Sequence, residues 1–248
     1  MAGVSQALGT LGLVVVLKEI RSKLEQVASK EDATNLQRYF KTGPGEYGEG
    51  DRFLGVRVGP LRKLAKQYRT LPFSDVESLI NSAYHEERML ALLILVEQFQ
   101  RGAAEDQKRI FNLYLHNLRN INNWDLVDIS APRIVGGYLQ EHDRKRLYSL
   151  ARSPHLWSRR VAMMATLFFI SHDDFDDSLK IADLLLNDKH DLIHKAVGWM
   201  LREVGNRDRQ VEEKFLKSRY KNMPRTMLRY AIEKFPPARR KRYLDGRI

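Results

Sequence analysis

A short segment near the middle of the chain places an aromatic ring and a carboxylate where they can act together. Trp124 and Asp128 are four residues apart, so in a helix their side chains lie on one face. Two more tryptophans occur in similar settings, with Trp157 just before two arginines and Trp199 just after a Lys-Ala-Val-Gly run. Aromatic faces, a carboxylate and arginines together can hold a nucleic acid and stabilise a developing cation. The alternative is structural, since a tryptophan usually packs in a core and an aspartate often caps a helix.

The positive charge of the chain is concentrated at its C-terminal end. Among 248 residues there are 42 Lys and Arg against 31 Asp and Glu, which gives a formal net charge of +11. Residues 217–248 contain 11 of the basic and two of the acidic side chains, so this segment alone accounts for +9. The asymmetry favours a polyanionic partner, either nucleic acid or an anionic membrane. The alternative is a basic tail without a specific partner.

Composition excludes several kinds of chemistry. The chain has no Cys, which rules out disulfides, thiolate zinc sites, iron–sulfur clusters and a cysteine nucleophile. His190 and His194 are spaced as in a zinc helix but lack a third ligand, so we interpret them as surface or capping residues. No apolar run approaches the ~18 residues of a membrane span. The apolar stretch at residues 8–17 lacks the flanking features of a signal peptide, so we expect a cytoplasmic protein.

The spacing of apolar residues predicts helices throughout the chain. They recur at i, i+3 and i+4 and show no sustained alternation, so we expect an all-α protein without a sheet. Similar segments place Ala162, Ala196 and Ala231 34 and 35 residues apart. A fourth, at Ala91, lies 71 residues before Ala162, which leaves room for one more unit near Asp128. This period is typical of an α-solenoid of HEAT, armadillo or TPR type, in which antiparallel helix pairs form a concave face that binds a large partner.

We expect one repeat domain over residues 1–248. Residues 1–33 would add an N-terminal helical extension. The strongly basic residues 217–248 keep a helical spacing, so they would form the last helices rather than a disordered tail. The glycine-rich residues 43–50 lack the Lys-Ser/Thr pair of a phosphate-binding loop, so we interpret them as a flexible connector.

With these residues in place, the sequence resembles the AlkD-type alkylpurine DNA glycosylases, a family of HEAT-like repeat DNA alkylation repair proteins. The matching stretches run in the order of that family and extend over roughly residues 34–235: residues 37–41, 53–57, 61–64, 124–128, 156–162 and 195–203. The Trp-Asp-Leu-Val-Asp element at 124–128 and the Lys-Ala-Val-Gly-Trp-Met-Leu-Arg-Glu element at 195–203 are specific in combination. The resemblance implies a solenoid of HEAT-like antiparallel helix pairs with a concave DNA-binding face.

The resemblance also implies a role for each matching side chain. Asp128 matches the catalytic aspartate of the family. Trp124 and Trp199 match two tryptophans that hold the backbone and sugar of the damaged nucleotide, and Tyr39 matches a third aromatic residue in the same cleft. Arg160 matches an arginine that binds the phosphate backbone.

Further DNA contacts are expected from basic side chains alone. Arg159 is adjacent to Arg160 and could share its phosphate contact, and the sequence does not separate the two. The remaining candidates lie in the basic C-terminal segment and are Arg239, Arg240, Lys241 and Arg242. They would hold the phosphate backbone and make binding dependent on salt.

The implied activity is hydrolysis of the N-glycosidic bond of cationic N3- or N7-alkylated purines, such as 7-methylguanine or 3-methyladenine, in duplex DNA. This activity would initiate base excision repair. Such a purine is already positively charged, so it leaves without a general acid, and the enzyme must stabilise an oxocarbenium-like sugar and place a water. One carboxylate near C1′ would supply about 2.7–4 kcal/mol by analogy with a single oxyanion donor, and each tryptophan face roughly 0.5–2 kcal/mol. No metal or organic cofactor is implied.

A second hypothesis is a non-catalytic HEAT-like protein that binds damaged or branched DNA. The presence of Asp128 together with Trp124 and Trp199 favours catalysis. In either case the expected partner is double-stranded DNA, containing alkylated purines for the enzyme, with no membrane and a monomeric protein. A protein–protein scaffold would leave the basic segment without a purpose.

Overall fold

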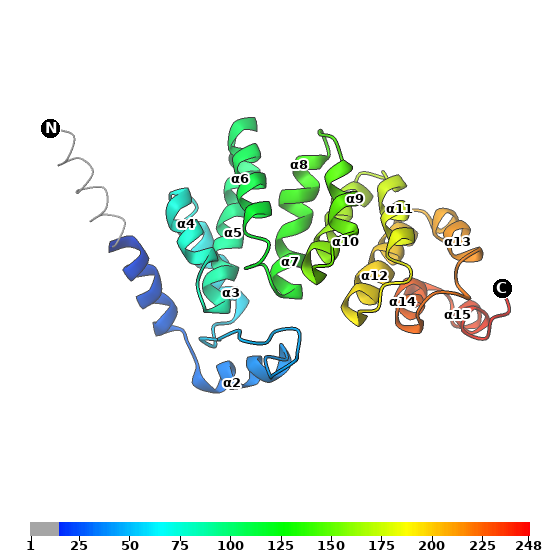
Figure 1. The fold of residues 1–248 in the computed structure, drawn as a ribbon, viewed down its shortest axis with the longest axis horizontal. Helices are drawn as coiled ribbons and strands as arrows, with labels where there is room; N and C mark the ends of the chain where they lie inside the picture. Colours follow the sequence, from blue (N-terminus) through cyan, green and yellow to red (C-terminus); the bar gives the residue numbers. More distant parts are fainter. Residues whose placement is uncertain (1–14) are drawn as a thin grey trace. The chain divides into compact units, whose positions relative to one another are not determined.

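The computed structural model describes residues 15–248, and these residues form helices joined by short loops, without a strand (Figure 1). An isolated β-bridge between Arg52 and Tyr84 is the extended pairing recorded within this range. The all-α class predicted from the sequence is therefore confirmed. Across the same residues, no helix combines the length and the apolar character that crossing a membrane requires.

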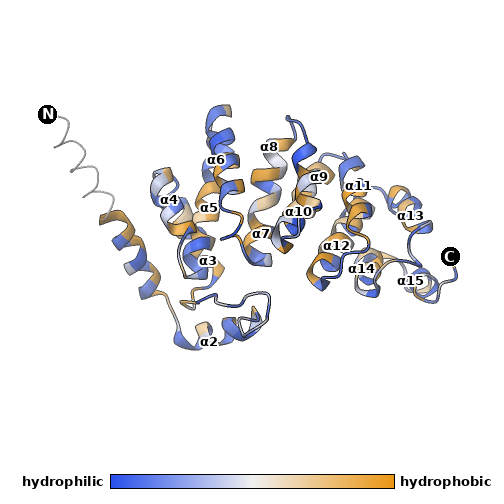
Figure 2. Cartoon of the chain, in the orientation of Figure 1, coloured by the Kyte–Doolittle hydropathy of each residue, from blue (hydrophilic) through white to orange (hydrophobic). Residues whose placement is uncertain are grey.

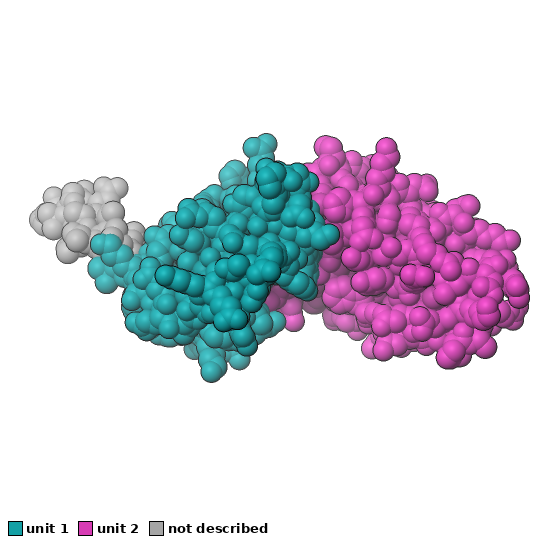
Figure 3. Space-filling model, turned by 90° about the horizontal axis from the view of Figure 1, so that it is seen from below, with its two compact units in different colours: residues 1–126 teal, residues 127–248 magenta. Residues whose placement is uncertain are grey.

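Most helices carry polar residues on one side and apolar residues on the other, as Figure 2 shows by the alternation of blue and orange along each ribbon. The chain divides into two compact units, residues 1–126 and residues 127–248, which Figure 3 colours separately. Each unit is described here by itself. The single domain expected from the sequence stays a prediction.

Unit 1 is built around one long buried helix. Its described elements are a helix at residues 15–26, α2 (Lys30–Tyr39), α3 (Val58–Gln67), α4 (Phe73–Ile80), α5 (His85–Arg101), α6 (Ala104–His116) and the first residues of α7 (Trp124–Ala131). Helix α5 packs against α3, α4 and α6, and its residues 85–96 are all buried. A helix that is enclosed on all sides needs apolar residues around its circumference, as the run from Met89 to Val96 provides.

The N-terminal helix at residues 15–26 is fixed to the rest of unit 1. Ile20 and Leu24 are fully buried. On its polar side Arg21 donates to the Glu87 carboxylate, with Nε 3.1 Å from Oε1. The extra helix expected for the apolar residues 8–17 lies mostly outside the described residues, and the described part from residue 15 is helical.

The connector between α2 and α3 is held by close backbone contacts. Gly55 has a φ of +84°, and a Cβ at this position would lie 2.0 Å from the Ser29 carbonyl oxygen, so only glycine fits. The Glu86 carboxylate accepts hydrogen bonds from three successive backbone N–H groups, at residues 54–56, with distances of 2.8 to 3.1 Å. A carboxylate from α5 therefore fixes the path of the chain into α3.

Helix α7 starts a continuous helical run that ends at Leu139. It consists of α7, a π-helical turn (Pro132–Gly136) and α8 (Gly137–Leu139). Pro132 has no backbone N–H, and a wider turn accommodates the missing hydrogen bond. This helical run lies where the repeat period predicted a further repeat, near Asp128. Residues 124–126 of α7 belong to unit 1, and its remaining residues belong to unit 2.

Unit 2 repeats one helix-packing contact. Its further elements are α9 (Lys145–Ala151), α10 (Leu156–Ile170), α11 (Asp176–Leu184), α12 (Asp191–Arg207), α13 (Arg209–Lys217), α14 (Arg225–Ala231), a 3₁₀ turn (Ile232–Lys234) and α15 (Pro237–Leu244). Helix α12 packs against α10 and α14, and the three alanines of the predicted repeat are fully buried on these three helices. A Cβ at Gly136 would lie 2.3 Å from the Ala165 carbonyl oxygen, and one at Gly198 2.4 Å from that of Met227. The two glycines face partners 29 residues ahead in both cases, which supports the repeat in this unit.

The basic C-terminal segment is helical, as predicted. It contains the end of α13, all of α14 and all of α15. Tyr243 of α15 is 2% exposed and lies edge-on to Tyr220 and Phe235, with ring centroids 5.3 and 5.5 Å apart. Helix α15 is therefore packed on the unit through its tyrosine, while Arg239 and Arg240 are half-buried and Arg242 is exposed.

Candidate active site

Helix α7 begins where two asparagines end the preceding loop. The buried Asn123 side chain accepts a hydrogen bond from the Trp124 backbone N–H at 2.8 Å. Asp125 lies in the first turn, where a negative charge offsets the helix dipole. The helix therefore carries Trp124 and Asp128 on one face, as the spacing predicted.

Asp128 forms a bidentate ion pair with Arg160 of α10. The Arg160 Nε lies 2.8 Å from Oδ1 and its Nη2 lies 2.7 Å from Oδ2. The remaining Nη1 donates to the Leu192 carbonyl oxygen at the start of α12, at 2.6 Å. Both carboxylate oxygens are fixed in one plane by a rigid guanidinium, which requires the carboxylate to be ionised. The Asp128 side chain retains 15% exposure, against 5% for Arg160.

Arg160 is engaged by partners within the protein. The residue is 4% exposed, and its guanidinium is directed at Asp128 and a backbone carbonyl. Arg159 is also engaged, because its Nε lies 2.6 Å from the Asp188 carboxylate and its Nη1 donates to two carbonyl oxygens. In this structure Arg160 is the side chain that holds Asp128, and the phosphate contact implied by its match to the family stays a prediction.

Trp199 is held by a hydrogen bond within its own helix. Its indole N–H donates to the Glu203 carboxylate at 2.9 Å, one turn further along α12. Arg202 lies beside Glu203 at 3.3 Å and also pairs with Glu233. Trp199 is half-buried. Trp157 is 5% exposed and packs in the core.

Tyr39 and Trp124 are brought together in unit 1. Tyr39, the last residue of α2, is 65% exposed and lies edge-on to the Trp124 ring, with centroids 6.0 Å apart. Below them the buried Phe40 stacks on Trp124 at 5.3 Å and on Phe53 at 5.2 Å. We call the rings of Tyr39, Phe40, Phe53, Trp124 and His85 the aromatic stack. Within the aromatic stack, the buried rings of Phe40, Phe53 and His85 support the more exposed Trp124 and Tyr39.

His85 joins this stack to two carboxylates. Its imidazole lies 4.6 Å from the Phe53 ring and 5.1 Å from the Phe40 ring. Nε2 lies 2.8 Å from the Asp125 carboxylate of α7, and Nδ1 lies 3.4 Å from the Asp51 carboxylate of the connector. Burial alone would lower the pKa of His85, but the charge and hydrogen bond of Asp125 and the hydrogen bond of Asp51 raise it to about 9. The imidazole is therefore a buried cation at neutral pH.

Asp51 forms hydrogen bonds with several polar groups next to the aromatic stack. It is 6% exposed and accepts hydrogen bonds from Arg88 at 2.7 Å and Asn122 at 2.8 Å, besides facing His85. Burial would raise the pKa of Asp51, but the His85 hydrogen bond and the Arg88 charge lower it. The loop before α7, the connector and the start of α5 are thus joined by one buried charged network.

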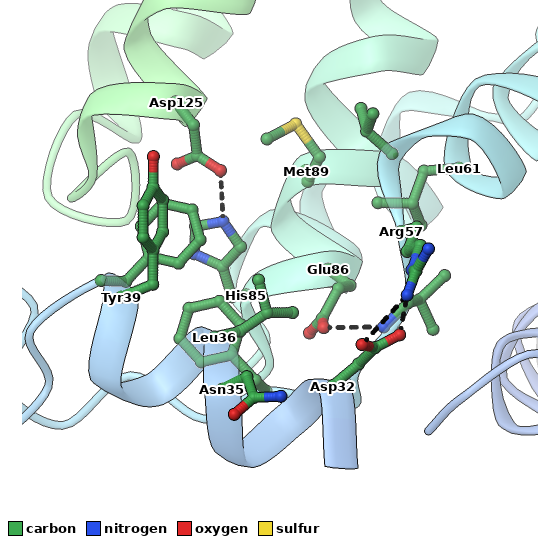
Figure 4. A pocket seen from close by; sticks show the side chains of 14 residues that line it. Asp32, Asn35, Leu36, Tyr39, Arg57, Leu61, His85, Glu86, Met89 and Asp125 are labelled. Carbon is green, nitrogen blue, oxygen red and sulfur yellow. Dashed lines mark hydrogen bonds and ion pairs between the residues drawn. The ribbon is translucent and has the colours of Figure 1, made fainter. Parts of the chain in front are cut away.

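A pocket of about 520 Å³ opens beside the aromatic stack. Figure 4 shows its polar wall, where Asp125 bonds to His85 and Tyr39 lies next to the pair. On the opposite side Asp32 of α2 pairs with Arg57, with Oδ2 3.0 Å from Nε. Asn35, Glu86 and leucine, valine, phenylalanine and methionine side chains form the rest of the lining.

The four basic residues expected to contact DNA lie together on α15 but differ in their partners. Arg239 pairs with Glu213 at 2.6 Å, and Lys241 pairs with Asp245 at 3.1 Å. Arg240 and Arg242 have no ion-pair partner among residues 15–248, and Arg242 donates to the Arg247 carbonyl oxygen. In the same range, no group of three or more His, Asp or Glu side chains is placed to hold a metal ion.

The sequence matches the family described as DNA alkylation repair enzymes over residues 20–235. The chain belongs to this family. A search of curated proteins gave no match. Among solved structures, one described as a predicted DNA alkylation repair enzyme from Enterococcus faecalis is 19% identical with a TM-score of 0.66, covering 85% of this chain and 97% of the other. AlkD2 from Streptococcus mutans is 16% identical with a TM-score of 0.52, covering 84% of this chain and 99% of its own. At these identities the two structures support the shared all-α fold.

Within this family fold, several site residues escaped the sequence reasoning. His85 was not among the predicted site residues, and it is 3% exposed and contacts Asp125. Asp125 was quoted only as part of the Trp-Asp-Leu-Val-Asp element. Phe40 was noted only as a neighbour of Tyr39 in a matching stretch. The one signal in the sequence was the position of Asp125 directly beside Trp124, and it indicated no partner.

Proposed function

We propose that the chain is a monofunctional DNA glycosylase that removes cationic N3- and N7-alkylpurines from duplex DNA. Membership of the DNA alkylation repair enzyme family supports a role on alkylated DNA. The observation that carries the specific activity is the Asp128 carboxylate, held ionised by Arg160 on the same helix face as Trp124. A fixed, partly exposed anion next to an aromatic face suits a reaction that develops positive charge.

The proposed reaction needs no acid to expel the base. The bond between N9 of the alkylpurine and C1′ breaks, its electron pair neutralises the cationic base, and positive charge develops on the sugar. Asp128 stabilises that charge and orients a water, which adds to C1′ and gives up one proton. Because the guanidinium of Arg160 fixes the carboxylate, the electrostatic stabilisation requires no reorganisation when the charge appears.

The aromatic residues would hold the damaged nucleotide while this occurs. Trp124 and Trp199 would place their ring faces against the cationic sugar, with Tyr39 beside Trp124. The exposure of Tyr39 and the half-buried state of both tryptophans support this role. Phosphate contacts would come from Arg240, Arg242 and their neighbours on α15. We further propose that a single copy acts, in the cytoplasm, on double-stranded DNA.

The test is release of free base from a duplex containing one N7-methylguanine. We expect wild-type protein to release 7-methylguanine and to leave an abasic site, and Asp128→Asn to slow single-turnover release by about 10²–10³-fold. Asp143→Asn serves as the matched control, because it removes an exposed carboxylate of unit 2 whose contact is with Lys145. It should release base at the wild-type rate.

The non-catalytic hypothesis predicts a different result. Tight binding to the damaged duplex with no base release by wild type would support it and would exclude the glycosylase. Release that Asp128→Asn leaves unchanged would remove Asp128 from the mechanism. A neutral lesion of similar size should be a poor substrate, since the proposed site supplies no acid to activate it.

A further inference from the structure

His85 occupies the junction of every element that supports Trp124. Its ring lies against Phe40 and Phe53, and Phe40 in turn stacks on Trp124. Its Nε2 contacts Asp125, the residue next to Trp124 on α7. Deep burial, with 3% exposure, gives its contacts no competition from bulk water.

Two carboxylates face the imidazole from opposite sides, which only a doubly protonated ring can satisfy. Asp125 of α7 faces Nε2, and Asp51 of the connector faces Nδ1. A neutral imidazole has one N–H donor and one lone pair, so one carboxylate would lose its donor and face a lone pair instead. Arg88 of α5 also contacts Asp51, on the carboxylate oxygen that does not face His85: its Nη2 lies 2.7 Å from Asp51 Oδ1.

We infer that protonated His85 is a positioning residue for base excision, holding the N-terminal turn of α7 and the Trp124 ring in place. The inference rests on the proposed function and assigns a role to a residue that does not touch the substrate. Loss of the proton would leave the Asp125 side of α7 unfixed. Asp128 lies one turn further along the same helix, so its approach to C1′ would change with that turn.

The charges around His85 determine where the proton is lost. Asp51 and Asp125 favour the imidazolium, while Arg88 and burial oppose it, and the pKa of His85 is raised to about 9. Glu86 is occupied by three backbone N–H groups, and Asp32 is paired with Arg57 across the pocket. Positioning should therefore persist through neutral pH and fail at alkaline pH.

The experiment compares wild type with His85→Gln on the N7-methylguanine duplex from pH 6 to 10. Glutamine keeps one donor and cannot carry charge. We expect wild type to be faster by about tenfold or more in single-turnover rate at pH 7, with equal affinity for the duplex, because a small misplacement of reacting groups costs rate rather than binding. The ratio of the two rates should fall towards one above pH 9. Dividing the rates cancels the pH dependence of the substrate itself.

Two further variants separate positioning from folding. Asp125→Asn removes the largest contribution that raises the pKa of His85, so the fall in the wild-type advantage should move to lower pH. His116→Gln changes an exposed histidine of α6 and should match wild type at every pH. A ratio that stays constant from pH 6 to 10, or a midpoint that Asp125→Asn leaves in place, would overturn the inference.

A second readout does not depend on catalysis. The three tryptophans give three indole N–H resonances, and that of Trp124 can be assigned with Trp124→Phe. It should shift with a midpoint near pH 9 in wild type and should not shift in His85→Gln. If wild type releases no base, the proposed function fails while this titration still tests the positioning role. A Trp124 resonance that is insensitive to His85 would reject the role even in an active enzyme.

Discussion

Two aspartates of α7, three residues apart, are each paired with a cation from another helix, and the two cations differ in kind. In unit 1, Asp125 pairs with the buried imidazole of His85. In unit 2, Asp128 pairs with the guanidinium of Arg160. A guanidinium keeps its charge at every accessible pH, whereas an imidazolium can lose it. The comparison assigns the permanent pair to the proposed chemistry and the titratable pair to the support of Trp124.

The strongest test of this contrast breaks the permanent pair. Arg160→Met removes the bidentate cation from the mostly buried Asp128 carboxylate, so we expect the free energy of unfolding to fall by about 3–5 kcal/mol and base release to be lost. Adding Asp128→Leu removes that anion and should recover much of the stability without restoring activity. Urea unfolding and single-turnover assays on both variants measure the two effects.

Substitutions of Arg160 also test separately whether the ion pair stabilises the fold and whether it positions Asp128. If Arg160→Met unfolds no more easily than wild type, the ion pair is not a structural element of unit 2. If the variant remains folded and excises base at the wild-type rate, Arg160 does not position Asp128. Arg160→Lys keeps the charge but loses the bidentate geometry, so it should be intermediate in both measurements.

Breaking the titratable pair should give a smaller effect that depends on pH. The pKa of His85 is raised from 6.5 in the unfolded chain to about 9 in the folded one, so its stabilising contribution is complete below pH 6.5 and is lost as the pH rises through 9. By linkage this contribution is about 3 kcal/mol. We expect the stability difference between wild type and His85→Gln to shrink by up to that amount between pH 6 and 10.

The difference between the two proteins is the quantity to measure. Burial raises the pKa of Glu212 in unit 2 to about 8, and this group also reduces stability as the pH rises. Both proteins contain Glu212, so its contribution cancels in the difference. A constant difference across this range would show that folding does not raise the pKa of His85.

The contrast between the two pairs also marks how far the sequence could predict the structure. Helical periodicity and the i, i+4 spacing of Trp124 and Asp128 are local properties, and the structure has both. The partners of buried charges are not local. Arg160 lies 32 residues from Asp128 and His85 lies 40 residues from Asp125, so no short-range pattern connects them.

Adjacent arginines show the same limit at a finer scale. From the sequence, Arg159 and Arg160 are both candidates for the same phosphate contact. On α10 they point in different directions, Arg159 to Asp188 and Arg160 to Asp128. A helix turns by about 100° per residue, so neighbours in sequence face different partners, and only the packing of α7 and α12 decides which partner each one meets.

The two tryptophans offer a milder comparison. Trp124 is supported by ring stacking, whereas Trp199 depends on one hydrogen bond to Glu203. Trp199→Phe loses that bond, worth about 1 kcal/mol, so we expect a fall of severalfold in single-turnover rate. Glu203→Ala should reproduce most of this fall without touching the ring, while Glu141→Ala, at an exposed site of unit 2, should have no effect. Equal rates for Glu203→Ala and wild type would show that the ring orientation does not need the bond.

We expect the smallest effect on the rate of base release from α15. Its four basic residues form two groups of two, which differ in whether they have an acidic partner. Arg240 and Arg242 lack acidic partners among the described residues, while Arg239 and Lys241 are each paired with a carboxylate. Replacing either pair with glutamine removes two positive charges. The Arg240/Arg242 variant should flatten the salt dependence of DNA binding by up to about 0.9 in slope per lost phosphate contact, and the Arg239/Lys241 variant should flatten it less.

Base release at saturating protein should remain near the wild-type rate in both α15 variants, because these residues would bind phosphate and not the sugar. Equal salt slopes for the two variants would mean that net charge alone, and not the free arginines, governs binding. A loss of rate at unchanged affinity would instead connect α15 to the positioning of Trp199, whose helix packs against α14. The titration of affinity against salt, with rate measured on the same samples, therefore decides whether the charge asymmetry of the sequence serves binding alone.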